Sequence, residues 1–420
     1  MQRIKTNILN PVSSSQTDFQ KNVIITLENG KITSITNADT TSKREYHPEL
    51  IEGYDTNNKI IDRTDQICIP GFIDTHVHLS QYYIRGSHSP NLLHWLNTYT
   101  FAEELRSKDE NYARKTAEDF FADSVSKGTT TSVIYTAPLK QSCDIAFQVA
   151  KEKGVRAVLG MTMMDENSPD FLQQTAKSAF EDSAALFEKW NKKTDLLEYV
   201  FTPRFALTCS AELMKLTGDF AQQNNAYVQT HLSENKDEIQ RTLELFPDCR
   251  SYTDIYSKMN LLGSKTILGH VIHVTDEEIS ILKETNSKIA HCPDSNFFIK
   301  SGMFQWKKLR DTGIDFSLAS DVAGGTSLSM LNVMKMACFR QDNYLLSPQE
   351  AFYYATLGGA KVLGKENIIG SISTGKNADL VFLKLIDFEK YNTTELLSKM
   401  IYTHEDIQII ETLVQGRKVY

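Results

Sequence analysis

Residues 70–86 read PGFIDTHVHLSQYYIRG, a hydrophobic run that ends in two histidines, His76 and His78. Residues two apart in a strand point to the same face, so both imidazoles would project together, about 7 Å apart along the strand. Two converging imidazoles suit one metal ion, although such a triplet also arises by chance. The pattern therefore gains weight only if further ligands follow other strands.

Strand-like and helical runs alternate from about residue 68 onward, which predicts an α/β fold with parallel strands. Eight such units in roughly 300 residues predict a (β/α)8 TIM-type barrel, whose active site lies at the C-terminal strand ends. The alternative, an open doubly wound sheet, lacks a G-x-G-x-x-G motif after any strand. The expected strands are Gly71–His78, Thr129–Ala137, Val155–Met163, Leu197–Phe205, Ala226–Glu234, Thr266–His273, Lys288–Pro293 and Phe316–Asp321.

The two ends of the chain contain short β-like runs instead. An Asn-Gly pair at Asn29 predicts a hairpin. We expect residues 1–67 and 371–420 to form one small β domain beside a barrel of residues 68–370. Residues 37–58 are polar and are expected to form a loop.

The composition is that of an ordinary globular protein, with 41% hydrophobic and 23% charged residues. A net charge of −8 argues against non-specific binding to nucleic acid or to an anionic membrane. No apolar run is long enough to span a bilayer, and the N-terminus shows no secretion signal. The six cysteines are scattered without a C-x-x-C motif, as expected for reduced thiols in a cytoplasmic protein.

Histidines and carboxylates stand at the ends of several expected strands. A buried core histidine is the simpler interpretation of any one of them, but the joint pattern favours a metal site. Three imidazoles and one carboxylate suit zinc or a similar first-row ion, with a position open for water. The expected ligands are His76, His78, His231 and Asp321.

Glu234 follows His231 by three residues and is the candidate general acid/base. A helix cap on the following helix is its alternative role. His270 is expected to orient the attacking water or the oxyanion, with a fifth ligand or a structural histidine as alternatives. His273 and His291 are expected to be structural or to support the ligands.

Two polar side chains suit the recognition of a substrate. Gln81 offers both a donor and an acceptor, and Arg204 offers a fixed fork of donors. A loop hydrogen bond for Gln81 and a salt bridge for Arg204 are equally compatible with the sequence. No phosphate-binding loop or basic cluster is present, so a free base fits better than a nucleotide. Phe205, Trp95 and Phe101 could form a flat apolar slot, or belong to the core.

Several segments resemble the amidohydrolase superfamily, and within it the guanine deaminase family. PGFIDTHVH, THLSEN, ILGH, HCPDSN and ASDVAGG occur in the order typical of the superfamily. SQYYIRGS, LLHWLNTYTFAEELR, TPRFALTCS and SDVAGGTSLSMLNVM are similar to the pattern of the guanine deaminase family. The resemblance covers residues 68–365.

This resemblance implies a barrel with a composite β-sandwich, one zinc ion per subunit, hydrolytic deamination of guanine to xanthine, and a homodimer. It implies Glu234, Asp321 and His270 as catalytic residues, with Glu234 delivering a proton to N3 and Asp321 accepting one from water. Carried over by motif, the metal ligands are again His76, His78, His231 and Asp321. The implied guanine contacts are His78, Leu79, Ser80, Gln81, Arg204, Phe205, His231, Glu234 and Asp321.

Two other functions stay open at this stage. A different mononuclear amidohydrolase would act on a related purine, cytosine or a triazine. The second alternative is a scaffold protein with a barrel fold and no catalytic activity. The presence of all the expected metal ligands and of Glu234 argues against it. A two-metal hydrolase is disfavoured, because the fourth expected strand, Leu197–Phe205, has no lysine to bridge two ions.

Overall fold

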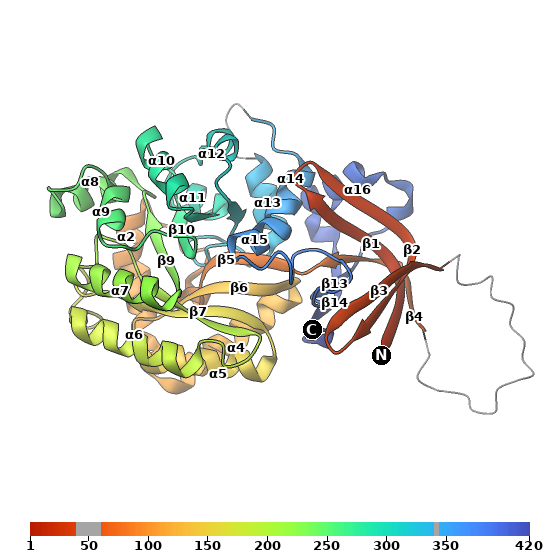
Figure 1. Cartoon of the computed structure of the whole chain (residues 1–420), viewed down its shortest axis with the longest axis horizontal. Helices are drawn as coiled ribbons and strands as arrows, with labels where there is room; N and C mark the ends of the chain where they lie inside the picture. Colours follow the sequence, from red (N-terminus) through yellow and green to blue (C-terminus); the bar gives the residue numbers. More distant parts are fainter. Residues whose placement is uncertain (39–59, 340–343) are drawn as a thin grey trace, which may run out of the picture.

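The computed structural model describes residues 1–38, 60–339 and 344–420, and within them the chain forms two sheets (Figure 1). One is an eight-stranded parallel barrel and the other is a seven-stranded sheet built from both ends of the chain. Beyond Ala38, the loop expected at residues 37–58 lies outside the described residues.

Neighbouring barrel strands follow one another in sequence order, and each pairs in parallel with the next. Nearly every residue of these strands is buried, as expected for parallel strands covered on both faces. The predicted (β/α)8 barrel is thereby confirmed. The strands are β5 (Phe72–His78), β6 (Thr129–Thr136), β7 (Arg156–Met163), β8 (Leu197–Pro203), β9 (Tyr227–Leu232), β10 (Thr266–His270), β11 (Lys288–His291) and β12 (Phe316–Leu318).

Six strands end one to three residues earlier than the sequence predicted: β6, β8, β9, β10, β11 and β12. At or after the ends of β9, β10 and β12 the backbone leaves the extended conformation. The chain takes a left-handed backbone conformation at Ser233 (φ 52°), His270 (φ 68°) and Asp321 (φ 48°). A left-handed residue turns the chain out of the extended conformation, so the strand stops at or just before it.

Contacts between the first and last strands bring the ends of the barrel together. The main-chain N–H of Asp321 donates to the carbonyl oxygen of His76 at 2.9 Å, and His78 N–H donates to the carbonyl of Val322 at 2.8 Å. The hydroxyls of Thr75 and Ser317 lie 2.7 Å apart. This closure places Asp321 beside the two histidines of β5.

Most helices lie around the barrel, whereas α16 lies beside the terminal sheet (Figure 1). The helix α4 (Glu110–Ser126) ends at its cap Lys127, because Gly128 adopts a φ of +81° directly after it. Asn235 caps the helix after β9 through a capping box. The helix α13 is described over Met330–Phe339, and residues 340–343 are outside the described ranges. The main helices are α2 (Leu92–Trp95), α3 (Phe101–Arg106), α4 (Glu110–Ser126), α5 (Lys140–Lys153), α6 (Ala176–Trp190), α7 (Ala211–Asn224), α8 (Lys236–Leu245), α9 (Tyr252–Lys258), α10 (Asp276–Glu284), α11 (Pro293–Phe298), α12 (Trp306–Thr312), α13 (Met330–Phe339), α14 (Pro348–Tyr354), α15 (Leu357–Val362) and α16 (Thr393–Tyr402).

The second sheet lies at one end of the molecule, next to the barrel (Figure 1), and has the strand order β15-β14-β13-β4-β1-β2-β3. The predicted hairpin is confirmed, with Asn29 and Gly30 both at positive φ in the turn between two antiparallel strands. In the part of the chain that the structure describes, no helix is long and apolar enough to cross a membrane. The strands are β1 (Gln2–Ser13), β2 (Gln16–Glu28), β3 (Lys31–Asn37), β4 (Ile60–Pro70), β13 (Leu380–Lys384), β14 (Gln408–Val414) and β15 (Arg417–Lys418).

A buried ion pair links the barrel to the terminal sheet. Arg156 on β7 donates from Nε and Nη2 to Asp379 at 3.2 and 3.1 Å, and both side chains are less than 5% exposed. The other carboxylate oxygen of Asp379 accepts from the N–H of Gln415 at 2.8 Å. Both carboxylate oxygens of Asp379 therefore accept hydrogen bonds, one from β7 of the barrel and the other from the residue after β14.

We expect Arg156→Met to lower the free energy of unfolding by about 3 kcal/mol, because it leaves the Asp379 carboxylate buried without its counter-charge. Equilibrium urea unfolding measures the change. The control is Arg114→Met, which removes ion pairs with the exposed Glu118 and Glu152 and should cost less than about 1 kcal/mol. Equal losses in the two variants would contradict the structural role of the buried pair.

Candidate active site

The ends of β5 and β9 bring three imidazoles against the carboxylate of Asp321. Oδ1 of Asp321 lies 3.2 Å from His76 Nε2 and 3.3 Å from His78 Nε2. His78 Nε2 lies 3.3 Å from both His76 Nε2 and His231 Nε2. Four ligands about 2.0–2.1 Å from an ion at tetrahedral angles are about 3.3–3.4 Å apart. These four separations fit an ion of the size of zinc, and the ligating atoms of all four side chains lie within 4.8 Å of one another.

The protonation states of this group are those of metal ligands. Burial lowers the pKa of His78 to about 4 and that of His231 well below its usual value, so both imidazoles are neutral near pH 7. Burial raises the pKa of Asp321, but hydrogen bonds from His76 and His78 outweigh it and the net pKa is well below normal. Neutral imidazoles and an anionic carboxylate are the forms that bind a divalent cation.

Neighbouring groups hold these ligands in place. Nδ1 of His231 lies 2.7 Å from the carbonyl oxygen of Arg204, and the Tyr256 hydroxyl donates to the His231 carbonyl at 2.6 Å. The ring of His76 lies directly over Gly269, where a Cβ atom would be 2.7 Å from His76 Cε1. Such contacts fix the tautomer and direction of a ligating imidazole.

Glu234 is 3% exposed and follows the end of β9. Its Oε1 accepts from the Ser301 hydroxyl at 2.7 Å, and its Oε2 lies 3.4 Å from His270 Nε2. Burial raises its pKa, which the proximity of His270 partly offsets. The main-chain N–H of Glu234 donates to Glu238, the acidic residue of the α8 capping box. The helix cap expected as the alternative role for Glu234 is thus made by Asn235 and Glu238.

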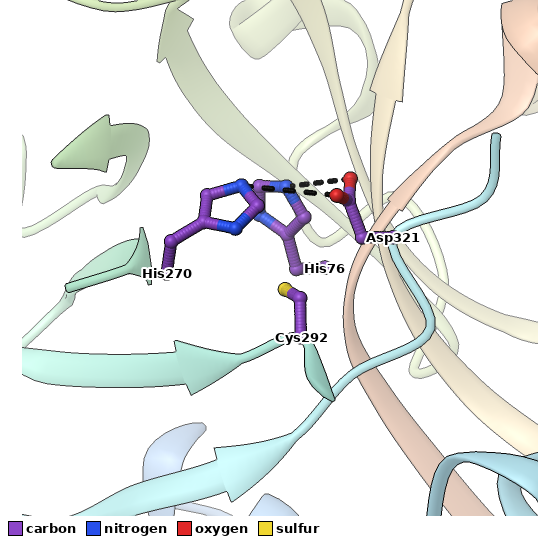
Figure 2. Close-up of side chains that lie close together, drawn as sticks. All are labelled: His76, His270, Cys292 and Asp321. Atoms are coloured by element: carbon purple, nitrogen blue, oxygen red, sulfur yellow. Dashed lines mark ion pairs between the residues drawn. The ribbon is translucent and has the colours of Figure 1, made fainter. Parts of the chain in front are cut away.

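His270 contacts both carboxylates of the site. Its Nε2 is 3.7 Å from Asp321 Oδ2, and its Nδ1 is 2.8 Å from the side-chain oxygen of Asn296. Figure 2 shows His76 and His270 directed at Asp321, with the sulfur of Cys292 below the two rings in that view. These four side chains form a second possible ligand group that shares His76 and Asp321 with the first. Burial raises the pKa of the Cys292 thiol well above normal, so Cys292 is protonated near pH 7. The group that contains Cys292 is therefore a weaker metal site than the group of three histidines and Asp321.

The other two histidines near the site do not line the pocket. His273 Nε2 lies 2.8 Å from the carbonyl oxygen of Ser301, the residue that donates to Glu234. His291 stacks on Phe304 with ring centroids 4.1 Å apart, and Asn296 Nδ2 lies 3.4 Å from its Nδ1. Burial lowers the pKa of His291 to about 3.

A pocket opens over three of the four candidate metal ligands, His78, His231 and Asp321. Leu92, Trp95 and Leu96, from α2 and the residue after it, form one wall, and Phe205 forms another. Of the predicted substrate contacts, Leu79 and Ser80 lie outside the lining, and Leu79 packs in the core. The pocket is lined by His78, Gln81, Leu92, Trp95, Leu96, Arg204, Phe205, His231, Glu234, His270, Ile299, Asp321 and Gly324.

Gln81 and Arg204 meet at a buried carboxylate that the sequence analysis missed. Oε1 of Glu104 on α3 accepts from Gln81 Nε2 at 2.9 Å, and both Glu104 oxygens accept from Arg204 Nη1 at 3.1 and 2.9 Å. Arg204 therefore makes the salt bridge considered as its alternative role and still lines the pocket. The Arg204 guanidinium carbon lies 5.4 Å from the centroid of Phe101, which stands beside this cluster and outside the pocket lining.

Ser301 and Glu104 were the two supporting residues that sequence reasoning did not find. Ser301 lies in the segment HCPDSNFFIKSG, and Glu104 lies in LLHWLNTYTFAEELR. The second segment resembles the guanine deaminase family and the first begins with the superfamily motif HCPDSN, but a serine and one of two adjacent glutamates carry no local signal of burial. Only their 5% and 1% exposure in the folded chain reveals them.

Comparisons with known proteins agree with this geometry. The profile of the amidohydrolase family matches residues 67–419. A guanine deaminase of Escherichia coli (strain K12) is 38% identical over 373 residues, which cover 86% of this chain and 85% of that protein. A solved structure of E. coli guanine deaminase superposes with a TM-score of 0.93 at 32% identity, covering 100% of this chain and 99% of the other. The guanine deaminase of C. acetobutylicum, solved with guanine in its active site, gives a TM-score of 0.91 at 32% identity with 100% of both chains covered.

We expect Gly269→Ala to weaken zinc binding about 10- to 100-fold, because the new Cβ would displace the His76 ring. Elemental analysis after dialysis against a chelator of graded strength measures the loss. The control is Gly263→Ala, whose Cβ would meet only the end of the Gln222 side chain. Unchanged zinc retention in Gly269→Ala would show that the ring of His76 does not need this space.

The neutral, buried His291 should make stability depend on pH. Its folded pKa of about 3 lies below the unfolded value of 6.5, so the unfolded chain binds the extra proton between these values. The free energy of unfolding is therefore unaffected by His291 above about pH 6.5 and decreases as the pH falls below that value. Between pH 6 and 5, metal-free protein should lose about 1 kcal/mol more than the His291→Phe variant. Urea unfolding at several pH values tests this, with the exposed His88→Phe as control; parallel curves for all three proteins would contradict it.

Proposed function

This chain belongs to the amidohydrolase family, and we propose that it hydrolyses guanine to xanthine and ammonia in purine breakdown. The observation that carries the proposal is one pocket lined by three members of the His/Asp group, by the buried acid Glu234, and by Gln81 and Arg204, which we infer to bind the purine. The similarity to guanine deaminases over most of the chain supports the choice of substrate.

We infer one zinc ion per subunit, held by His76, His78, His231 and Asp321. Four separations of 3.2–3.3 Å among their ligating atoms, with all four atoms within 4.8 Å of one another, support a single ion of this kind. When bound, such an ion polarises a water molecule and makes it nucleophilic near neutral pH. Leu92, Trp95 and Leu96 add apolar side chains to the lining of the same pocket.

Two carboxylates near the bound guanine carry out different proton transfers. Burial raises the pKa of Glu234, which suits it to hold a proton and deliver it to N3 of guanine. The Ser301 hydroxyl occupies Glu234 Oε1, which leaves Oε2 for the transfer. Asp321 accepts a proton from the attacking water, and His270, between the two carboxylates, orients it. One water adds at C2 and one ammonia leaves in each turnover.

The family resemblance also supports a homodimer, and the six scattered cysteines, all free thiols, support a cytoplasmic enzyme. Light scattering of the purified protein tests the dimer. A protein that stays monomeric at high concentration would contradict that part of the proposal without affecting the reaction.

We expect Glu234→Gln to retain zinc and lose at least about 100-fold in turnover, because the amide cannot deliver the proton. The assay combines the absorbance change from guanine to xanthine, ammonia release and elemental analysis. The control is Glu244→Gln, an exposed acid on α8, which should keep full activity.

Full activity of Glu234→Gln would remove Glu234 from the mechanism. A panel of guanine, cytosine and a triazine tests the substrate. Zinc-loaded wild-type protein that releases ammonia from one of the others and not from guanine would overturn the proposed function.

A further inference from the structure

We propose that Glu104 sets the substrate specificity of the pocket by fixing which hydrogen-bonding groups Gln81 and Arg204 present. This inference rests on the proposed function and deepens it. Glu104 does not line the pocket and is a positioning residue. With Gln81 and Arg204 held by Glu104, the pocket would accept a purine edge that has an N–H donor beside a carbonyl acceptor. It would reject an edge that has a ring-nitrogen acceptor beside an amino donor.

Glu104 lies behind the two side chains that line the pocket. Glu104 is 1% exposed and lies on α3. In the sequence it is 23 residues from Gln81 and 100 residues from Arg204. The same oxygen, Oε1, accepts from Gln81 Nε2 at 2.9 Å and from Arg204 Nη1 at 3.1 Å. Because they share one acceptor, the amide and the guanidinium lie side by side.

The carboxylate decides the direction of the Gln81 amide. A glutamine amide has a donor end and an acceptor end of nearly equal shape, and its orientation follows from its partners. Paired with the permanently charged Arg204, Glu104 only accepts hydrogen bonds. A reversed amide would place two oxygens 2.9 Å apart in a buried site, so Gln81 must point its NH2 at Glu104 and keep Oε1 as an acceptor.

Arg204 supplies the complementary half of the pattern. Its Nη1 is used by both Glu104 oxygens and lies 3.8 Å from the sulfur of Met164. The guanidinium has only donors, so it can bind only acceptors on a ligand. Gln81 Oε1 and the remaining donors of Arg204 therefore offer one acceptor beside donors.

Guanine has the matching edge, with the N1–H donor next to the O6 acceptor. 2,6-Diaminopurine carries the same amino group at C2, but its N1 is an acceptor and its 6-amino group is a donor. Both halves of that edge would face groups of the same kind in this pocket. A site built to pair polar groups rejects such an analogue strongly, because the buried groups are left unpaired.

The test compares guanine with 2,6-diaminopurine in wild type and in Glu104→Gln. The neutral amide of the variant both donates and accepts, so Gln81 is free to turn. We expect kcat/KM for guanine to fall about 10- to 100-fold, mostly through KM, and the ratio of guanine to 2,6-diaminopurine to fall at least about tenfold. Dissociation constants of both bases, measured in the Glu234→Gln background, should show the same loss of preference without turnover.

Glu103→Gln is the matched control. Glu103 is the neighbouring buried acid on α3, but its carboxylate bonds Arg106 and Tyr112 and faces neither Gln81 nor Arg204. Its substitution should leave the preference for guanine unchanged. If Glu104→Gln does not fold, Gln81→Leu, which keeps the Glu104–Arg204 pair, must lower the same ratio.

An unchanged ratio of the two bases in Glu104→Gln, with equal losses for both, would overturn the specificity role and leave Glu104 as a structural counter-charge. An unchanged ratio in Gln81→Leu would overturn it as well. Wild-type protein with no guanine turnover would instead overturn the proposed function, so the two failures are distinct.

Discussion

The hydrogen bond from the Asp321 N–H to the carbonyl of His76 is the contact on which the site depends. It joins the end of the barrel's last strand to the end of its first. Without this closure, Asp321 would belong to a free sheet edge, far from the histidines of β5. With it, one carboxylate oxygen lies 3.2–3.3 Å from two imidazoles. The architecture of the barrel and the donor set for a cation therefore have a common origin.

The site concentrates buried charge and backbone strain, which the surrounding structure must offset. Ser233, His270 and Asp321 all have positive φ, at an order of 1 kcal/mol each for residues other than glycine. Buried ionisable groups are tolerated only when hydrogen-bonded or paired. Glu234 has Ser301, and Arg204 has Glu104. These partners hold Glu234, the proposed acid, and Arg204, a proposed substrate contact, in fixed directions, which is the arrangement expected of a preorganised active site.

Much of the fold was predictable because its signals are local. The eight strands were found from apolar runs, and the hairpin from Asn29 and Gly30. The ends of β9, β10 and β12 were not, since a left-handed residue such as Ser233 has no reliable signature when it is not glycine. The four expected metal-binding side chains do lie together. Glu104 and Ser301 escaped because burial of a single polar residue depends on which distant segments cover it.

The sequence by itself determined the strand–helix alternation, the histidines at strand ends and the family, since these depend on residue type and spacing along the chain. Only the tertiary structure decided which oxygen of Glu234 is occupied and which carboxylate holds Gln81 and Arg204 together. It also decided that Leu79 packs in the core beside residues expected to touch substrate. The physical reason is that hydrogen-bond direction and desolvation arise between segments far apart in the sequence, such as those of Glu104 and Arg204, 100 residues apart, and no local pattern encodes their meeting.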